Sequence, residues 1–482
     1  MRRNASGLIL GNYFVGACVL GSSTRNFARW IRLVIGSRSK TESVDQSGAG
    51  PTPALPNDGS SSSTHSFTNS LRDFSWLNAR RVRFYSAVLL LAYLTAAVAQ
   101  LATAHHLRFK SGACIGGDFV NPYAASIAAL KGDPASVYDV HRQHVQEAAV
   151  IGKDFGVLGF HYPPMFLLLV MPLSMLPFIT SWILFETVTL AGYLAVLRRI
   201  APIPLGLWLA LTFPGVIINV MCGQNGFITT ALIGGGLLLL ERRPVLAGLL
   251  FGLMAYKPQF AILIPFTLLV AREWRALFAT AISAILFAAI SLAVFGEPTW
   301  RAFLVSIPFT QKIVLERGAI TFSTLQSIFG AVRMWGGSVE VAYLCQAAVA
   351  LYASLAVVLV WRTGRPFALK AATLAVGSLM ISPYVLQYDL VLLALPIAWL
   401  AMEGFEKGFL PYEKAVLTIA WLLPRISLPI SQNAKIPIAP IVIIALMTTI
   451  LRRATRRESA AQDKEPLQRA HFGKAFSQAA QI

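Results

Sequence analysis

The stretch Gly116-Gly117-Asp118-Phe119 opens a polar interval in a chain that is otherwise dominated by long apolar runs. The interval ends at Phe160-His161-Tyr162-Pro163-Pro164, where the next apolar run begins. Because an apolar run ends shortly before Gly116, this interval is expected to emerge from a membrane as a large first outer loop. A carboxylate close to the end of a spanning helix lies at the membrane surface, where it can be ionised and still reach a lipid head group. Asp118 is therefore the candidate for the chemistry.

The composition sets the class of protein. The 482-residue chain is 56% apolar and 13% charged, with a mean hydropathy of +0.62. These values exclude an ordinary soluble globule and predict an all-α polytopic membrane protein. The formal net charge of +19 comes from short Lys/Arg clusters between apolar runs, a pattern that fixes topology, and we expect no binding to nucleic acid. The four cysteines show no CxxC or Cys/His spacing, which favours core packing over a zinc site or a disulfide framework.

The amino-terminal region differs from the rest of the chain. The apolar run at residues 8–20 has the length of a signal-peptide core, but Asn12 and Tyr13 interrupt it and no small-x-small cleavage site follows. We interpret it as a dispensable or mis-started extension. Residues 36–75 are rich in Ser, Thr, Gly, Pro and Asn and are expected to be disordered. The expected parts are an extension (1–82), a transmembrane domain (83–451) and a basic cytoplasmic tail (452–482).

The apolar runs predict the spans. The first is residues 84–104, and the others are 165–176, 178–197, 205–220, 226–240, 245–256, 260–270, 276–295, 341–361, 368–381, 390–401, 415–423 and 438–451. Basic clusters mark cytoplasmic ends at 80–83, 198–199, 241–243, 272–275, 362–365 and 452–457. If residues 165–176 crossed the membrane, the cluster at 198–199 and those after it would fall outside. All clusters lie on the cytoplasmic side only if residues 165–176, which contain Pro172, form an interfacial or half-inserted segment. This choice gives about 12 spans, with both termini inside.

The remaining intervals fall outside on this topology. Within the first outer loop, residues 124–130 and 135–150 are expected to form short amphipathic helices along the membrane interface. Residues 297–337 form a second outer interval, expected as a re-entrant or surface helix pair. Smaller outer turns, at 221–225, 256–259 and 382–384, are expected to converge on the face that carries Asp118.

A set of motifs in fixed order carries a family resemblance. They are Asp118-Phe119, Tyr123-Ala124-Ala125, Leu130-x-Gly132, Tyr138-Asp139, Phe160-x-Tyr162-Pro163-Pro164, Pro172-Leu173, Leu176-Pro177, Gly223-Gln224-Asn225, and Gly248 to Gly252 followed by Lys257-Pro258-Gln259. In order and spacing they resemble glycosyltransferase family 87, the polyprenyl-phosphate-mannose-dependent mannosyltransferases with the GT-C fold. The similarity covers roughly residues 84–400, with weaker register to 451.

The resemblance implies an activity and a site. A hexose, expected to be mannose, would pass with inversion from a polyprenyl phosphate to a hydroxyl of a glycan or glycolipid acceptor, outside the cytoplasmic (inner) membrane. Asp118 matches the position of the family's base, and one carboxylate suffices because a phosphate leaving group needs no general acid. Cations near the membrane surface should stabilise the departing phosphate; Lys257 is the first candidate, with Arg301, Lys312 and Arg317 as weaker ones. No metal or cofactor besides the donor substrate is expected, and membrane lipids surround the chain.

Each of these residues has a second interpretation. Asp118 can be a helix cap, and Lys257 can be a lysine that snorkels from a helix end. His161, beside Tyr162, contacts substrate or caps the turn before Pro163-Pro164.

The other polar candidates are equally open. Gln224 and Asn225 are sugar ligands or ordinary turn residues, and Gln259 follows Lys257 in the next outer turn. Tyr388-Asp389 lies near the outer end of a span, where an acid is a functional candidate or a member of an internal ion pair.

Two other classes of function compete with the enzyme. A secondary transporter or lipid-linked-saccharide flippase is typically built from two related halves with charges at the bilayer midplane, and we find no such internal repeat. A non-catalytic membrane subunit of an envelope-assembly complex would need no outer cations, so Lys257 and Arg301 argue against it.

Overall fold

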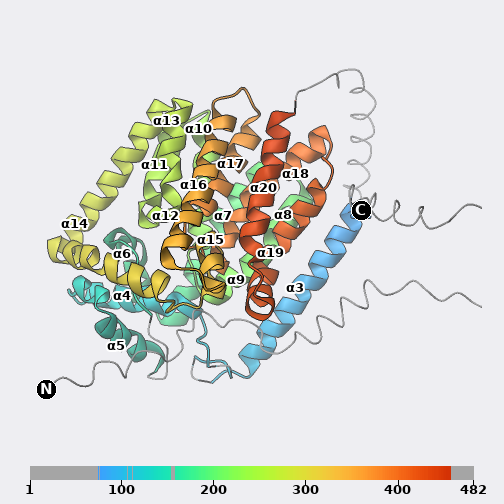
Figure 1. Ribbon diagram of the computed structural model, residues 1–482. Helices are drawn as coiled ribbons and strands as arrows, with labels where there is room; N and C mark the ends of the chain where they lie inside the picture. Colours follow the sequence, from blue (N-terminus) through green and yellow to red (C-terminus); the bar gives the residue numbers. More distant parts are fainter. Residues whose placement is uncertain (1–73, 75, 106, 111, 153–157, 457–482) are drawn as a thin grey trace, which may run out of the picture.

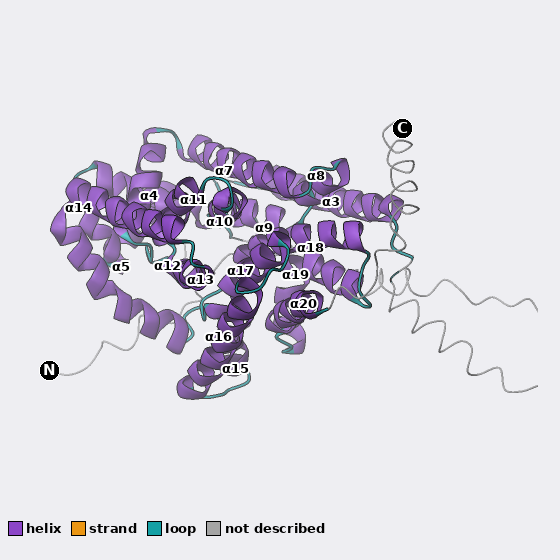
Figure 2. Cartoon of the chain, turned by 90° about the horizontal axis from the view of Figure 1, so that it is seen from above, coloured by secondary structure: helices purple, strands orange, loops and turns teal. Residues whose placement is uncertain are grey.

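The computed structural model describes residues 74, 76–105, 107–110, 112–152 and 158–456. Across these residues the chain is helical, and Figure 2 shows only helices and loops. Eight of the described helices are long and apolar enough to cross a membrane. These observations confirm a multi-pass helical membrane protein. The predictions for residues 1–73, including Cys18, and for the tail from residue 457 lie outside the described residues.

The helices follow the apolar runs closely. They are α3 (Ala79–Ala102), α4 (Val120–Leu130), α5 (Val140–Ile151), α6 (Pro164–Val170), α7 (Phe178–Ile200), α8 (Pro204–Leu211), α9 (Pro214–Cys222), α10 (Gly226–Leu240), α11 (Pro244–Leu253), α12 (Pro258–Ala261), α13 (Leu263–Ala271), α14 (Trp274–Thr310), α15 (Ile328–Met334), α16 (Val339–Trp361), α17 (Phe367–Ile381), α18 (Ala394–Lys407), α19 (Glu413–Ala434) and α20 (Ile438–Thr455). Short 3-10 helices form at Gly117–Phe119, Pro134–Tyr138, Met171–Met175, Met254–Tyr256, Phe322–Thr324 and Gln387–Leu393, and a π-helix forms at Gln311–Glu316.

Prolines begin many of these helices. Pro164, Pro204, Pro214, Pro244 and Pro258 each occupy the first position of a helix. At that position the missing N–H is one that the helix would leave unpaired, and the fixed φ of proline suits the first turn. The prolines therefore divide the apolar sequence into many short helices.

The number of spans depends on the short helices. Besides the eight long ones, the described chain has five apolar helices of 10–17 residues, at Pro164–Met175, Gly226–Leu240, Pro244–Tyr256, Pro258–Ala271 and Phe367–Ile381. The first of these is the segment expected to be interfacial or half-inserted, and its α-helix gives way to a 3-10 helix at Met171, next to Pro172. The total of about 12 spans, which counts the other four, stays a prediction.

Small residues bring the central helices together. A Cβ on Gly248 of α11 would lie 2.4 Å from the carbonyl oxygen of Ala276 in α14, and one on Gly252 would lie 2.4 Å from Cβ of Ser283. The two glycines are four residues apart, so they share one face of α11, and this face contacts α14. Close backbone approach through small residues is a common way to pack helices in a membrane, where the hydrophobic effect between helices is weak.

Helix α14 changes direction at the end of the molecule that carries the polar loop. Gly296 has non-helical torsions (φ 77°, ψ 165°), and Pro298 follows it. After this kink the helix runs past α6 and the short helices of the loop, as seen at the lower end of the view in Figure 1. Residues 297–337 contain two helical segments, the second half of α14 continued by the π-helix, and α15, and their re-entrant or surface position stays a prediction.

One position in the polar loop was wrongly predicted. The helix expected at 135–150 is divided at Asp139, which caps α5, into the 3-10 helix Pro134–Tyr138 and α5. The helix expected at 124–130 forms as α4 but is not an exposed amphipathic helix: Val120, Ala124 and Ala125 are fully buried, and α4 packs against α5, α6 and the 3-10 helix at Met171–Met175. Its small apolar side chains allow neighbours to surround it on all sides. By contrast, α3 lies at the edge of the bundle beside α8, with most of its surface open (Figure 2).

Candidate active site

A cavity of about 540 Å³ lies at the end of the bundle where the polar loop meets α14. The three predicted outer turns, 221–225, 256–259 and 382–384, all contribute to its wall, which confirms that they converge with Asp118. Much of the remaining wall is aromatic or aliphatic. The predicted site residues that line it are Asp118, His161, Tyr162, Gln224, Asn225, Lys257, Gln259 and Tyr388.

Asp118 is positioned by two turns whose backbones touch. It lies in the 3-10 helix Gly117–Phe119, and its Oδ2 accepts a hydrogen bond of 2.8 Å from Nε2 of Gln224. A Cβ on Gly223 would lie 1.9 Å from the carbonyl oxygen of Gly116, and one on Gly117 would lie 2.6 Å from that of Met221. Both glycines also have positive φ, 61° and 54°. Glycine is therefore required on both sides for the two turns to meet.

The surroundings of Asp118 make its carboxyl group less acidic than usual. Loss of bulk water within the cavity raises the pKa of Asp118 to about 6, and the hydrogen bond from Gln224 opposes part of this rise. The group is thus ionised at neutral pH but close to the point at which it accepts a proton. This combination suits a general base.

Lys257 is buried in the wall between the 3-10 helix Met254–Tyr256 and α12, with 2% of its side chain exposed. Its Nζ donates to Oδ1 of Asp389 at 2.5 Å and to Oδ1 of Asn225 at 2.9 Å. The rings of Phe260 and Tyr388 lie 5.2 and 5.3 Å from Nζ. Lys257 therefore does not snorkel to an outer surface. It is held by a carboxylate, an amide and two ring faces.

Asp389 lies behind the cavity wall and does not line the cavity. Its Oδ2 accepts the backbone N–H of Leu386, so this carboxylate caps the 3-10 helix Gln387–Leu393 while it pairs with Lys257. Of its two interpretations, the internal ion pair is the one that the structure contains.

His161 and Tyr162 face the cavity from the segment that leads into α6. The Nδ1 of His161 lies 3.0 Å from Oγ1 of Thr310 on α14, and the Tyr162 hydroxyl donates to Oε1 of Gln224 at 3.3 Å. Although the imidazole is exposed to the cavity, the protein around it displaces bulk water and lowers the pKa of His161 to about 4. It is therefore neutral at pH 7, and among the described cavity-lining residues Lys257 alone carries a positive charge.

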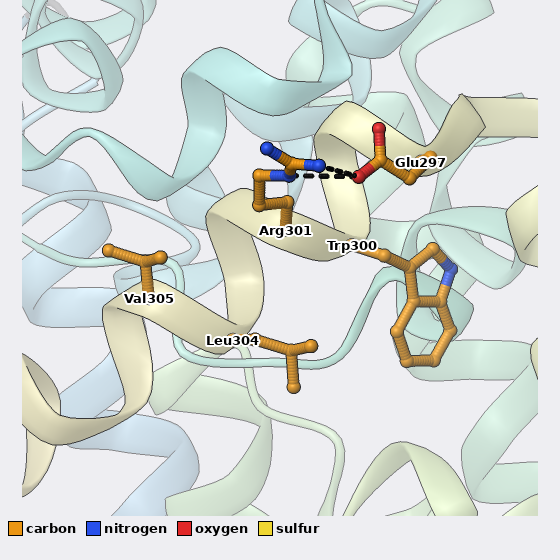
Figure 3. Close-up of a pocket in the computed structure, with 5 residues that line it drawn as sticks. All are labelled: Glu297, Trp300, Arg301, Leu304 and Val305. Atoms are coloured by element: carbon orange, nitrogen blue, oxygen red, sulfur yellow. Dashed lines mark hydrogen bonds and ion pairs between the residues drawn. The ribbon is translucent and has the colours of Figure 1, made fainter.

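The structure does not bring Arg301 to this site. Its side chain is 75% exposed and pairs with Glu297, 2.6 Å away, on the same helix. Figure 3 shows the two beside Trp300, Leu304 and Val305, which line a separate surface depression. Lys312 and Arg317 are also exposed and do not line the cavity.

Two buried carboxylates support the site and were missed by the sequence reasoning. Glu147 of α5 is fully buried and accepts a hydrogen bond of 2.7 Å from Asn121, which lines the cavity; burial raises the pKa of Glu147 to about 8. Glu186 of α7 accepts a hydrogen bond from Asn219, which in turn donates to the carbonyl oxygen of Gln224. Glu186 gave a usable signal, because an acid within an apolar span is a functional candidate. Nothing local in the sequence distinguishes Glu147.

The fold and this cavity define a multi-pass membrane protein with a partly open site whose described lining contains one carboxylate and one lysine. The model of glycosyltransferase family 87 matches residues 160–383, which confirms the family resemblance and supports a membrane glycosyltransferase. The matched region includes Lys257 and the 221–225 turn, and Asp118 lies before it. Comparisons with curated proteins and with solved structures gave no significant match.

Proposed function

We propose that this protein transfers a hexose, with mannose as the expected sugar, from a polyprenyl phosphate to a hydroxyl group of a glycan or glycolipid. The transfer would take place with inversion on the outer face of the cytoplasmic membrane. The observation that carries the proposal is a single cavity whose wall holds both a carboxylate of raised pKa, Asp118, and a buried lysine, Lys257. The family match supports the general class of reaction.

The proposed step is a direct displacement at the anomeric carbon. The acceptor oxygen forms the new bond to this carbon while the bond to the phosphate oxygen breaks, and the acceptor proton passes to Asp118. The leaving group changes from a phosphodiester with one negative charge to a polyprenyl phosphate monoester with an additional one. It is stable as an anion, so no general acid is needed.

Lys257 would bind the phosphate and stabilise the charge that it gains. An ammonium group has three N–H donors, and the contacts to Asp389 and Asn225 use two of them. The third is available for a phosphate oxygen. Because the Lys257 side chain is buried, such a contact is stronger than in bulk solvent.

The other lining residues provide a surface for the sugar and the acceptor. Tyr162 and Tyr388 present aromatic rings, while His161 and Gln259 present hydrogen-bonding groups. Because His161 is neutral, its contribution would be a hydrogen bond to a sugar hydroxyl and not a charge on the phosphate.

The test is sugar transfer by the purified protein in nanodiscs. Synthetic polyprenyl-phosphate mannose and the matching glucose donor are supplied with lipid extracts as the source of acceptor, and labelled products are identified by mass spectrometry. In parallel, proteoliposomes loaded with the donor are assayed for its movement between leaflets. Transfer without flux supports the proposal, whereas flux without transfer would favour the transporter class.

A further inference from the structure

Adjacent residues of one turn each hold one of the two charged groups of the site. Gln224 donates to Oδ2 of Asp118 at 2.8 Å, and Asn225 accepts from Nζ of Lys257 at 2.9 Å. We propose that Gln224 and Asn225 are positioning residues, which set the base and the phosphate-binding cation in place, and that they are not sugar ligands. This inference rests on the proposed function, and it gives the turn a role in the proposed transfer reaction.

The contacts of Gln224 fix the orientation of its amide group. Its Oε1 accepts from the Tyr162 hydroxyl, which leaves Nε2 to donate to Asp118. An amide N–H can donate to the ionised carboxylate, which has only acceptors. The bond therefore favours the form of Asp118 that can take a proton. Among the described residues no hydrogen bond is made to Oδ1, so this oxygen is the one that can receive the acceptor proton.

Asn225 acts on the other charged group. Like Lys257, it is 2% exposed and lines the cavity, so its role is set by its contacts. Its Oδ1 and the Oδ1 of Asp389 both accept hydrogen bonds from Nζ of Lys257, so the two oxygens hold the ammonium group between them. Losing either contact would let the ammonium group move, because a lysine side chain has four flexible carbons.

The turn that carries Gln224 and Asn225 is held in place by Asn219 of α9. Nδ2 of Asn219 donates to the carbonyl oxygen of Gln224 at 2.8 Å and to Oε2 of Glu186 at 3.2 Å, while its Oδ1 accepts the backbone N–H of Gly226 at 2.9 Å. On its other side, Gly223 is in backbone contact with the turn that carries Asp118. A turn fixed from both directions can transmit a defined geometry to the side chains it carries.

The experiment measures two separable effects. Gln224→Ala and the longer Gln224→Met remove the hydrogen bond to Asp118 and should lower kcat by roughly 10- to 100-fold, because a small displacement of a catalytic group has an effect of this size. Donor affinity should change less than about twofold. Asn225→Ala should weaken donor binding by roughly tenfold, with a smaller change in kcat. Gln432→Ala, at an exposed site on α19 away from the cavity, is the control for purification and insertion.

The pH profile gives a readout that a merely structural role would not move. Removing the Gln224 bond should move the acid limb of kcat/KM above its wild-type position near pH 6, because that bond lowers the pKa of Asp118. Asn225→Ala should leave this limb in place. The acid limb is assigned to Asp118 because the pKa values of the neighbouring titratable groups are shifted away from 6. Burial lowers the pKa of His161 to about 4 and raises that of Glu147 to about 8, and it also raises the pKa of the Tyr162 and Tyr384 hydroxyls.

Different results would refute the positioning role of Gln224 and Asn225 and the proposed sugar transfer. An unchanged acid limb in both Gln224 variants, together with altered discrimination between mannose and glucose donors, would overturn the positioning role and indicate sugar ligands. Full activity in both variants would also overturn it. Absence of transfer by the wild-type protein would instead refute the proposed function. Thermal unfolding in nanodiscs is measured for every variant, and the Met and Ala variants must agree for the positioning role to stand.

Discussion

Removal of one member of the buried Lys257–Asp389 pair should destabilise the protein strongly. Both side chains are 2% exposed and their charged atoms are 2.5 Å apart. Lys257→Met leaves the Asp389 carboxylate buried with only the N–H of Leu386 as a described hydrogen-bond partner. A buried charge that loses its partner typically costs about 3–5 kcal/mol. By contrast, Lys257→Met combined with Asp389→Asn removes both charges and keeps an oxygen for the N–H of Leu386, so we expect about 1 kcal/mol or less.

The assay is unfolding in mixed micelles, followed by circular dichroism as the fraction of denaturing detergent is raised. The matched control is the exposed pair of Arg301 and Glu297, with side chains 75% and 64% exposed. Arg301→Ala should change the free energy of unfolding by about 1 kcal/mol or less, because water screens an exposed pair. A Lys257→Met variant as stable as Arg301→Ala would refute the reasoning, as would a double variant that is less stable than the single one.

Three further predictions follow from the site and the topology. The kcat/KM of the wild-type protein should fall about tenfold between pH 7 and pH 5, because a base with a pKa near 6, as for Asp118, is about 90% ionised at the first pH and about 10% at the second; a flat profile would count against this base. Gly223→Ala should abolish transfer, whereas Gly132→Ala, also at positive φ but with no atom within 4 Å of the added Cβ, should cost only about 1 kcal/mol of stability; equal loss in the two variants would show that backbone strain, not contact between the turns, is responsible. Cysteine labelling in intact cells should modify Lys131→Cys and not Arg243→Cys, because basic clusters stay inside; the reverse pattern would invert the topology.

The order and type of the helices were accessible from the sequence because apolar runs and prolines mark them locally. The convergence of the three outer turns was also predictable, since topology alone places them at one end of the bundle. The burial of α4 was not, because a short apolar helix can lie on a membrane or inside a protein, and only its tertiary neighbours decide.

The partners of the site residues were beyond the sequence. Gln224 and Asp118 are 106 residues apart, so no local pattern shows that the amide holds the carboxylate. The exclusion of Arg301 was likewise not evident from the sequence alone. Phe303, Ser306 and Thr310 line the cavity at helical spacing, and Arg301 shares the other face with Leu304 and Val305. Helical spacing places Arg301 and the cavity-lining residues on different faces of this segment, but only the structure shows which face meets the cavity.

The central claim is that Asp118 is the base, and Asp118→Asn tests it most directly. This change keeps the shape of the side chain and a hydrogen-bonding group for Gln224 but removes the ability to take a proton. Sugar transfer from synthetic polyprenyl-phosphate mannose in nanodiscs should fall by roughly 10²-fold or more, while donor binding, measured in parallel, changes little. Near-normal transfer by Asp118→Asn would contradict the account.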